Sequence, residues 1–191
     1  MGKIQIAPPN QEPITLAEAK LHLSVDAALV AEDSLITGLI ASARQQAEHR
    51  LGRALITQQW RFTMDAFPAF IDLPYPDLQS VQSIKYLDSD GVQQTLAVSE
   101  YQVITSGMIG RVQPAYGKRW PSGRVQPEAV WVDYICGYGA PGDVPQSIKA
   151  WILMAVATLY GQREGLSAGS LSEVPRNFYE GLLDPYWVPG V

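Results

Sequence analysis

Histidine and cysteine are scarce in this chain of 191 residues, which contains two histidines and one cysteine. The single cysteine, Cys136, excludes a disulfide within the chain, as is usual in a reducing compartment. His22 and His49 both fall on expected helices, and neither has a partner at the spacing of a metal site such as His-x-x-x-His. The sequence therefore predicts no metal centre.

Charged residues and long apolar runs are also few. Charged residues make up 17% of the chain, below the roughly 25% of an average soluble domain. The net charge is −5, and an acidic chain gains little from counterion release on a phosphate backbone, which disfavours general nucleic-acid binding. No apolar run approaches the ~18 residues of a membrane span, and the first residues lack the apolar core of a signal peptide. We expect a protein made in the cytoplasm, with no membrane partner.

The remaining motifs of enzyme chemistry are incomplete. Gly137-Tyr138-Gly139 precedes an expected helix but lacks the Lys-Ser/Thr of a phosphate-binding loop. Asp65 and Asp72 flank an apolar loop, and nothing identifies them as an acid/base pair. We expect no catalytic residue and no cofactor. The alternative is a small-molecule-binding or enzymatic domain whose pocket uses Asp65, Asp72 or the loop around Arg119 as polar groups.

Helical patterns lie at both ends of the chain. Thr15 and Glu18 have the spacing of a capping box at a helix start. A longer helix follows, with an apolar stripe at steps of three and four residues. This stripe comprises Leu35, Ile36, Leu39, Ile40, Ala43, Ala47 and Leu51. The expected helices are residues 16–23, 31–53, 145–163 and 175–184.

The middle of the chain alternates with the period of a strand. In residues 57–65, Trp60, Phe62 and Met64 share one face of the expected strand. Residues 72–77 contain two prolines and are expected to form a loop, and Asp90-Gly91 favours a type I′ hairpin turn. The fold class is therefore α+β, with a helical core bracketing a mostly antiparallel β segment at about residues 57–136.

The composition also suggests a division of the chain. We expect an N-terminal extended arm at residues 1–14, because this stretch is rich in proline and polar residues. A single α+β domain would span residues 15–164, with residues 57–136 as a β insertion. Residues 165–191 would form a flexible linker followed by a C-terminal docking tail.

Two features indicate contacts with other subunits. The helix at 145–163 is apolar nearly all round, so we expect one of its sides to face another subunit. Basic residues also gather around Tyr116 and Trp120 in a proline-rich loop, and could contact nucleic acid or acidic residues of a neighbouring subunit. These basic residues are Arg111, Lys118, Arg119 and Arg124. The candidates for a subunit interface are Trp151, Met154, Leu159 and Arg119.

The C-terminal end combines a flexible linker with a dense apolar segment. Exposed to water, so much apolar surface would be costly, so the segment either folds back on its own domain or docks on a partner. Pro185 and Pro189 favour an extended end, as in peptide-like docking into a groove. The candidate docking residues are Phe178, Leu182, Leu183, Pro185, Tyr186 and Trp187.

Several runs occur along the chain in a distinctive order and spacing. They are Ile14-Thr15-Leu16-Ala17-Glu18-Ala19-Lys20-Leu21-His22-Leu23, Gly52-Arg53-Ala54-Leu55, Leu78-Gln79-Ser80-Val81, Ile84-Lys85-Tyr86-Leu87-Asp88, Val144-Pro145, Ile148-Lys149 and Pro185-Tyr186. Together, from about Ile14 to Trp187, these runs resemble head–tail connector (adaptor or head completion) proteins of tailed bacteriophages and gene transfer agents.

The resemblance implies a structural protein of the virion neck, between head and tail. It implies a homo-oligomeric ring, often of twelve subunits, beneath the portal protein, with DNA passing through the lumen. The C-terminal segment would reach the portal, while a downstream connector, stopper or tail protein would bind the opposite side. Where many relatives have a basic residue after Pro-Tyr, this chain has Trp187. The alternative is a tail-completion protein that lies one layer further down the same channel of the virion.

Overall fold

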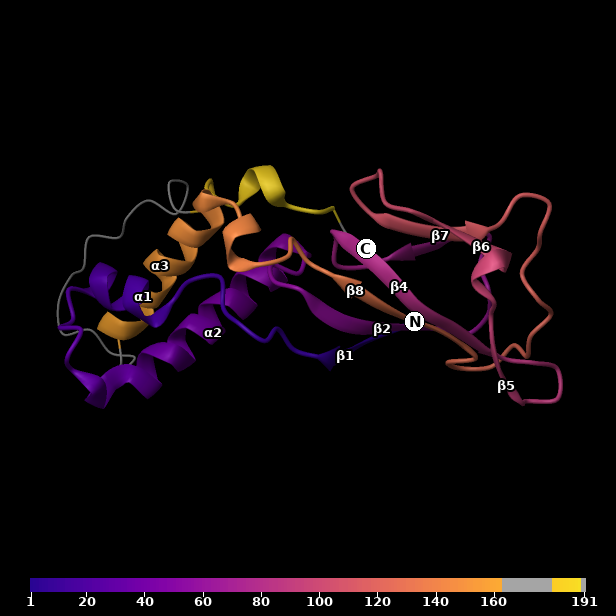
Figure 1. The fold of residues 1–191 in the computed structure, drawn as a ribbon, viewed down its shortest axis with the longest axis horizontal. Helices are drawn as coiled ribbons and strands as arrows, with labels where there is room; N and C mark the ends of the chain where they lie inside the picture. The colour runs from indigo at the N-terminus through magenta and orange to yellow at the C-terminus, as the bar shows by residue number, and fades with distance from the viewer. Residues whose placement is uncertain (163–179, 190–191) are drawn as a thin grey trace. The chain divides into compact units, whose positions relative to one another are not determined.

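The computed structural model describes residues 1–162 and 180–189, and the chain divides into two compact units. The β unit comprises Met1–Asn10, Gly52–Tyr138 and Pro189–Val191. The helical unit comprises Gln11–Leu51 and Gly139–Val188. Figure 1 shows α1, α2 and α3 gathered in the helical unit and the labelled strands in the β unit.

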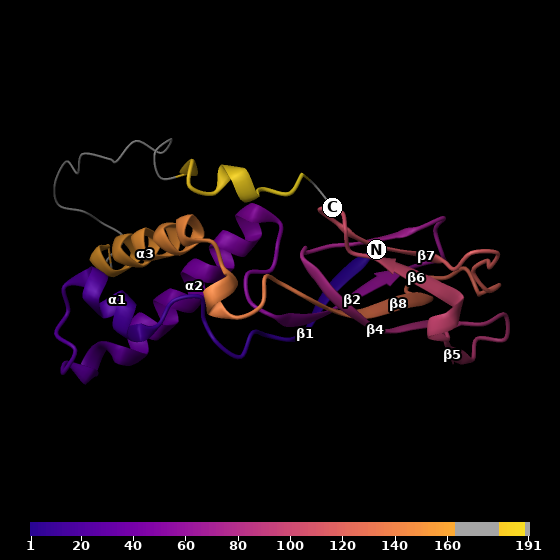
Figure 2. The same cartoon turned by 45° about the horizontal axis from the view of Figure 1, so that its top comes forward.

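Three α-helices form the helical unit, and each packs on the other two. Figure 2 shows α1 and α3 lying along α2. They are α1 (Leu16–Leu23), α2 (Asp33–Leu51) and α3 (Gln146–Gly161). The short 3-10 helices of this unit are η1 (Val30–Glu32), η3 (Pro141–Asp143) and η4 (Asp184–Tyr186). Of the helices that the structure describes, none is both long and apolar enough to cross a membrane.

The helix signals in the sequence are confirmed in detail. The capping box at the start of α1 is present, because the Thr15 hydroxyl accepts from the Glu18 N–H while the Glu18 carboxylate accepts from the Thr15 N–H. The stripe of α2 faces the core at Ile36, Ile40, Ala43, Ala47 and Leu51, all buried. Of its other two members, Leu39 is half-buried and Leu35 is 41% exposed. Only residues 180–184 of the helix expected at 175–184 are described: Glu180 is helical, residues 181–183 form a turn, and Asp184 begins η4.

Two antiparallel sheets form the β unit, which confirms the α+β class. The larger sheet has the order β1-β2-β8-β4-β5, and the smaller has the order β3-β7-β6. The larger sheet contains β1 (Gly2–Ala7), β2 (Gln58–Met64), β4 (Leu78–Leu87), β5 (Gln93–Thr95) and β8 (Val130–Cys136). The smaller sheet contains β3 (Ile71–Leu73), β6 (Tyr101–Ile104) and β7 (Gly110–Pro114), and the 3-10 helix η2 (Val98–Glu100) precedes β6.

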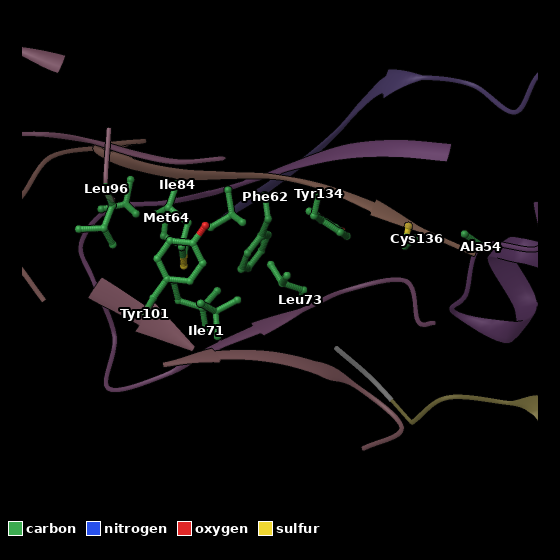
Figure 3. Packing of buried hydrophobic residues seen from close by; sticks show 13 residues of the cluster. Ala54, Phe62, Met64, Ile71, Leu73, Ile84, Leu96, Tyr101, Tyr134 and Cys136 are labelled. Carbon is green, nitrogen blue, oxygen red and sulfur yellow. The ribbon is translucent and has the colours of Figure 1, made fainter. Parts of the chain in front are cut away.

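The core of the β unit lies between these sheets. Figure 3 shows Phe62 and Met64 of β2 gathered with Ile71 and Leu73 of β3 and with Tyr101 of β6. All five side chains are nearly or fully buried. The alternation of residues 57–65 therefore marks the face that packs on the second sheet.

Three local expectations were wrong. Gly2–Ala7, expected within an extended arm, is a strand that pairs with β2. Within the segment expected as a loop, Asp72 and Leu73 belong to β3 and pair with β7. At the hairpin between β4 and β5, Gly91 alone is left-handed, with φ of 81°, whereas a type I′ turn needs positive φ at Asp90 as well. The Asp88 carboxylate instead accepts from two backbone N–H groups in this loop and fixes its shape.

Candidate docking surfaces

The C-terminal segment Glu180–Val188 folds back on the helical unit. Figure 2 shows it, in yellow, beside the end of α2. The Val188 N–H donates to the Leu51 carbonyl at 2.9 Å, and the Ser147 hydroxyl donates to the Tyr186 oxygen at 3.1 Å. Leu183 and Val188 are 5% and 4% exposed. Of the two alternatives for this apolar segment, the structure shows the first, folding back on its own unit, because Leu183 and Val188 are buried there.

The same segment leaves a different set of groups facing outward. Trp187 is 56% exposed and Pro185 is exposed, while Leu182 and Tyr186 are half-buried. Phe178, the sixth candidate for docking, lies outside the described residues. Contact with a partner through this segment would therefore centre on Trp187 and Pro185, with Leu183 serving as an anchor inside the subunit.

A shallow pocket of about 190 Å³ lies beside Trp187 in the helical unit. It is lined by Arg50, Leu51, Glu180, Leu183, Asp184 and Trp187. Arg50 Nη1 lies 3.0 Å from Glu180 Oε1, and its guanidinium lies 5.5 Å from the centre of the Trp151 ring. An indole, a guanidinium and two carboxylates around a small hollow suit a polar–aromatic contact with another protein.

The four candidates for a subunit interface differ in exposure. Trp151 is 1% exposed, so its indole packs the core of its own unit and has no surface to offer a neighbour. Met154 and Leu159 are half-buried on α3, and Arg119 is exposed in the loop between β7 and β8. These three side chains are accessible enough to contact a neighbouring subunit.

Two of the four basic residues in the predicted cluster are matched by acids. Arg111 makes a two-pronged contact with Asp72, at 2.6 and 3.0 Å, and lies 3.9 Å from the centre of the Phe70 ring. These hydrogen bonds raise the pKa of the Arg111 guanidinium. Lys118 Nζ lies 3.0 Å from Glu100 Oε1. The cluster is therefore a weak candidate for phosphate binding, because half of its charge is offset within the β unit.

The groups considered for enzyme chemistry have structural partners. Asp72 is held by Arg111, while the Asp65 carboxylate accepts from the Glu128 N–H at 3.1 Å, so each acid has its own role. Cys136 is fully buried in β8. In the part of the chain that the structure describes, no group of three His, Cys, Asp or Glu residues is arranged to hold a metal ion.

The exposed side chains between α1 and α2 were missed by sequence reasoning. Leu21, near the end of α1, is 82% exposed, and α1 buries Ala19 and Lys20 instead. Val30, in η1, is 72% exposed. The available signal was the apolar run at residues 27–31 in a stretch between two helices, which has no periodicity that would direct it to the core.

Comparison with known proteins places the chain among virion proteins. The family model of phage gp6-like head-tail connector proteins matches residues 13–113. No curated protein matches the chain. Among solved structures, a chain in the neck of an empty GTA particle, computed with C6 symmetry, is 19% identical with a TM-score of 0.82. A chain in the virion of a native gene transfer agent (GTA) particle is 20% identical with a TM-score of 0.79. A chain in the neck of a native GTA particle, computed with C12 symmetry, is 21% identical with a TM-score of 0.73.

Each of these three alignments covers 100% of this chain and 97% of the other, so the whole fold is shared and not one unit alone. The family model spans more than half of the 191 residues and includes α1, α2, the strands from β2 to β6 and most of β7. The chain therefore belongs to the family of phage gp6-like head-tail connector proteins, and it is a structural protein of the head–tail junction of a virion, not an enzyme.

Proposed function

We propose that this protein forms a ring beneath the portal of a capsid and joins the head to the tail. The observation that carries the proposal is the family match, together with a TM-score of 0.82 to a chain of a particle neck over 97% of that chain. The neck structures of the similar chains were computed with C6 and C12 symmetry, which suits a ring of twelve copies.

Passage of DNA through such a ring requires a surface that does not hold phosphates. Sequence counts give the β unit eight acidic and eight basic residues, and the helical unit eleven acidic and six basic residues. The whole net charge of −5 therefore belongs to the helical unit. With Arg111 and Lys118 already paired, this charge distribution supports a channel that DNA crosses without being bound.

The portal contact is assigned to the C-terminal segment. Trp187 presents a half-exposed indole next to the Arg50 pocket, and aromatic side chains of this kind are enriched at the centres of protein interfaces. Leu183 and Val188 hold the segment on α2 and α3, which fixes the indole in place before the partner arrives. A downstream connector or tail protein would occupy a different surface of the ring.

The test is reconstitution with the portal protein of the same particle. Purified portal rings are mixed with an excess of the protein and imaged by electron microscopy, and we expect an added ring of twelve copies on the portal. Portal rings that stay bare at saturating protein would overturn the proposal. Binding to the tail protein with no binding to the portal would instead favour a tail-completion protein one layer further down.

Trp187→Ala tests the assigned contact without unfolding the segment. Because the indole is 56% exposed, its loss should leave thermal stability nearly unchanged while weakening portal binding. Met108→Ala is the matched control, since Met108 is 58% exposed and lies in the β unit. Equal portal affinity for both variants would remove Trp187 from the contact. Deleting residues 175–191 is a coarser test, because it also removes the buried Leu183 and Val188.

A further inference from the structure

Four aliphatic side chains are exposed on the turn that joins α1 to α2 and on the helix ends beside it. Leu21 is 82% exposed, Leu29 is 45%, Val30 is 72% and Leu35 is 41%. We name these four residues the apolar tip. Single exposed aliphatics are common, but four within residues 21–35 are the mark of a surface that another protein covers.

The apolar tip is held in place by a buried lysine. Lys20 is 5% exposed, and its Nζ donates to the Ala27 carbonyl at 3.2 Å and to the Leu29 carbonyl at 2.9 Å. The same ammonium forms an ion pair with Asp33. The Asp26 carboxylate accepts from the Ala28 N–H at 2.9 Å, which closes the turn. Because these bonds already fix the backbone of the turn, binding of a partner to the tip costs little further conformational entropy.

The surroundings of the apolar tip are acidic. Asp26 is exposed and Glu32 is half-buried, where its carboxylate accepts from the Tyr160 hydroxyl. Lys20 offsets the charge of Asp33, whereas the exposed carboxylate of Asp26 adds a negative charge to the turn. The tip is therefore an apolar surface with an acidic rim, which disfavours an anionic membrane or a nucleic acid as its occupant.

A surface with the opposite properties lies in the β unit. The loop at residues 115–127, which we name the basic loop, contains three basic residues and no acidic one. Tyr116 and Val125 in this loop are 98% and 79% exposed. Among the described residues, neither Arg119 nor Arg124 has an acidic group within 4 Å, whereas Lys118 is paired with Glu100. The basic loop therefore presents two exposed apolar side chains, Tyr116 and Val125, together with the positive charges of Arg119 and Arg124.

The basic loop is also anchored. The Trp120 ring stacks on Phe67 with a centroid distance of 4.9 Å and an interplanar angle of 14°. The Arg124 N–H donates to the Leu87 carbonyl at 3.0 Å. Tyr116 is thus presented from a loop whose base is fixed to the β unit.

We propose that the apolar tip of one copy docks on the basic loop of the next copy around the ring, an inference that rests on the proposed ring function. A closed ring needs a heterologous interface, in which two different surfaces of the same chain meet. The tip and the basic loop both offer exposed apolar area, and the exposed Asp26 beside the tip is opposite in charge to the exposed Arg119 and Arg124 of the loop. Apolar burial would supply affinity, while the charges would set register and direction.

Cysteine cross-linking between copies tests the contact directly. The one native cysteine, Cys136, is fully buried, so introduced thiols are the reactive ones. Val30→Cys copies and Tyr116→Cys copies are mixed, assembled on portal rings and treated with a short bis-maleimide. We expect a cross-linked dimer in the mixture and none with either variant alone. Because each chain carries one reactive thiol, a cross-linked dimer always joins two copies, and the single-variant controls exclude tip–tip and loop–loop contacts.

The matched control replaces Tyr116→Cys by Met108→Cys, which lies in the same unit and is 58% exposed. A yield in the Val30–Tyr116 mixture no greater than in this control would overturn the contact. If the wild-type protein itself forms no ring on the portal, the proposed function fails and the contact fails with it.

A second test uses one variant for each surface. Val30→Asp disables the tip, and the double variant Arg119→Glu, Arg124→Glu disables the basic loop; all three side chains are exposed, so we expect wild-type melting curves. Neither variant should form rings on its own. A mixture should form heterodimers that grow no further, because one copy keeps an intact tip and the other an intact loop. Rings of wild-type size from either variant would overturn this contact and leave the proposed function standing.

Discussion

Anchoring of the C-terminal segment by Leu183 is open to a quantitative test. Leu183 is 5% exposed, and a buried leucine replaced by alanine loses about 2–5 kcal/mol. The segment lies on the surface of its unit and has room to settle, so we expect the lower part of that range, about 2–3 kcal/mol. Because opening of the segment is local, this cost falls on its docking equilibrium and not on the global unfolding of the chain.

Hydrogen exchange at the Val188 amide reports this docking equilibrium. That N–H donates to the Leu51 carbonyl at 2.9 Å and is exposed only when the segment lifts off. Since each 1.4 kcal/mol is a factor of ten, Leu183→Ala should accelerate its exchange by about 30- to 150-fold. Amides in the middle of α2 should keep their wild-type rates.

Trp187→Ala is the control for this measurement, because its indole is 56% exposed and its loss should change the Val188 rate by no more than about threefold. Equal exchange in wild type and Leu183→Ala would refute the anchoring role of Leu183. Acceleration of every amide by the same factor would refute the local nature of the opening.

Three further predictions concern stability. Gly110→Ala should lower the melting temperature, because a Cβ there would overlap the Leu78 side chain. Gly38→Ala should stabilise α2 by about 0.5–1 kcal/mol, since among the described residues no atom beyond its own stretch of helix lies within 4 Å of the added Cβ. Calorimetry of both variants checks this pair, and a destabilised Gly38→Ala would contradict it. Hydrogen bonds from Thr15 hold the pKa of the Glu18 carboxyl below its ordinary value of 4.5. The stability that the ionised Glu18 supplies is therefore present above pH 4.5 and is lost as the pH falls through the lowered pKa. Glu18→Gln removes this pH-dependent contribution, so the acid limb of a pH–stability curve should become flatter.

The parts of the fold that were predictable are those whose signal is local. The capping box at Thr15 and the stripe from Ile36 to Leu51 are read from neighbouring residues, and both are present. β1 could not be predicted in this way, since it depends on pairing with β2 more than fifty residues away, and its own side chains Ile4 and Ile6 are 47% and 44% exposed. Strand formation there is fixed by the partner strand and not by burial.

The same distinction, between local sequence signals and long-range contacts, applies to the candidate docking surfaces. The aromatic character of Trp187 and the charge of Arg119 were evident from the sequence, and both side chains are exposed. The local sequence pattern did not reveal that the Leu183 side chain is buried as an anchor within its own subunit, or that the Trp151 side chain fills the core of the helical unit. The local sequence pattern also did not reveal the apolar tip, because the exposure of that turn depends on the buried Lys20, which binds two backbone carbonyls and Asp33.

A reconstruction of the neck of the particle that carries this protein would show whether the chain forms the proposed ring beneath the portal. We expect a ring of twelve copies in contact with the portal, with Trp187 at the portal surface and the apolar tip of each copy against the basic loop of the next. A neck in which the portal meets a different protein, with this chain elsewhere in the particle, would contradict it.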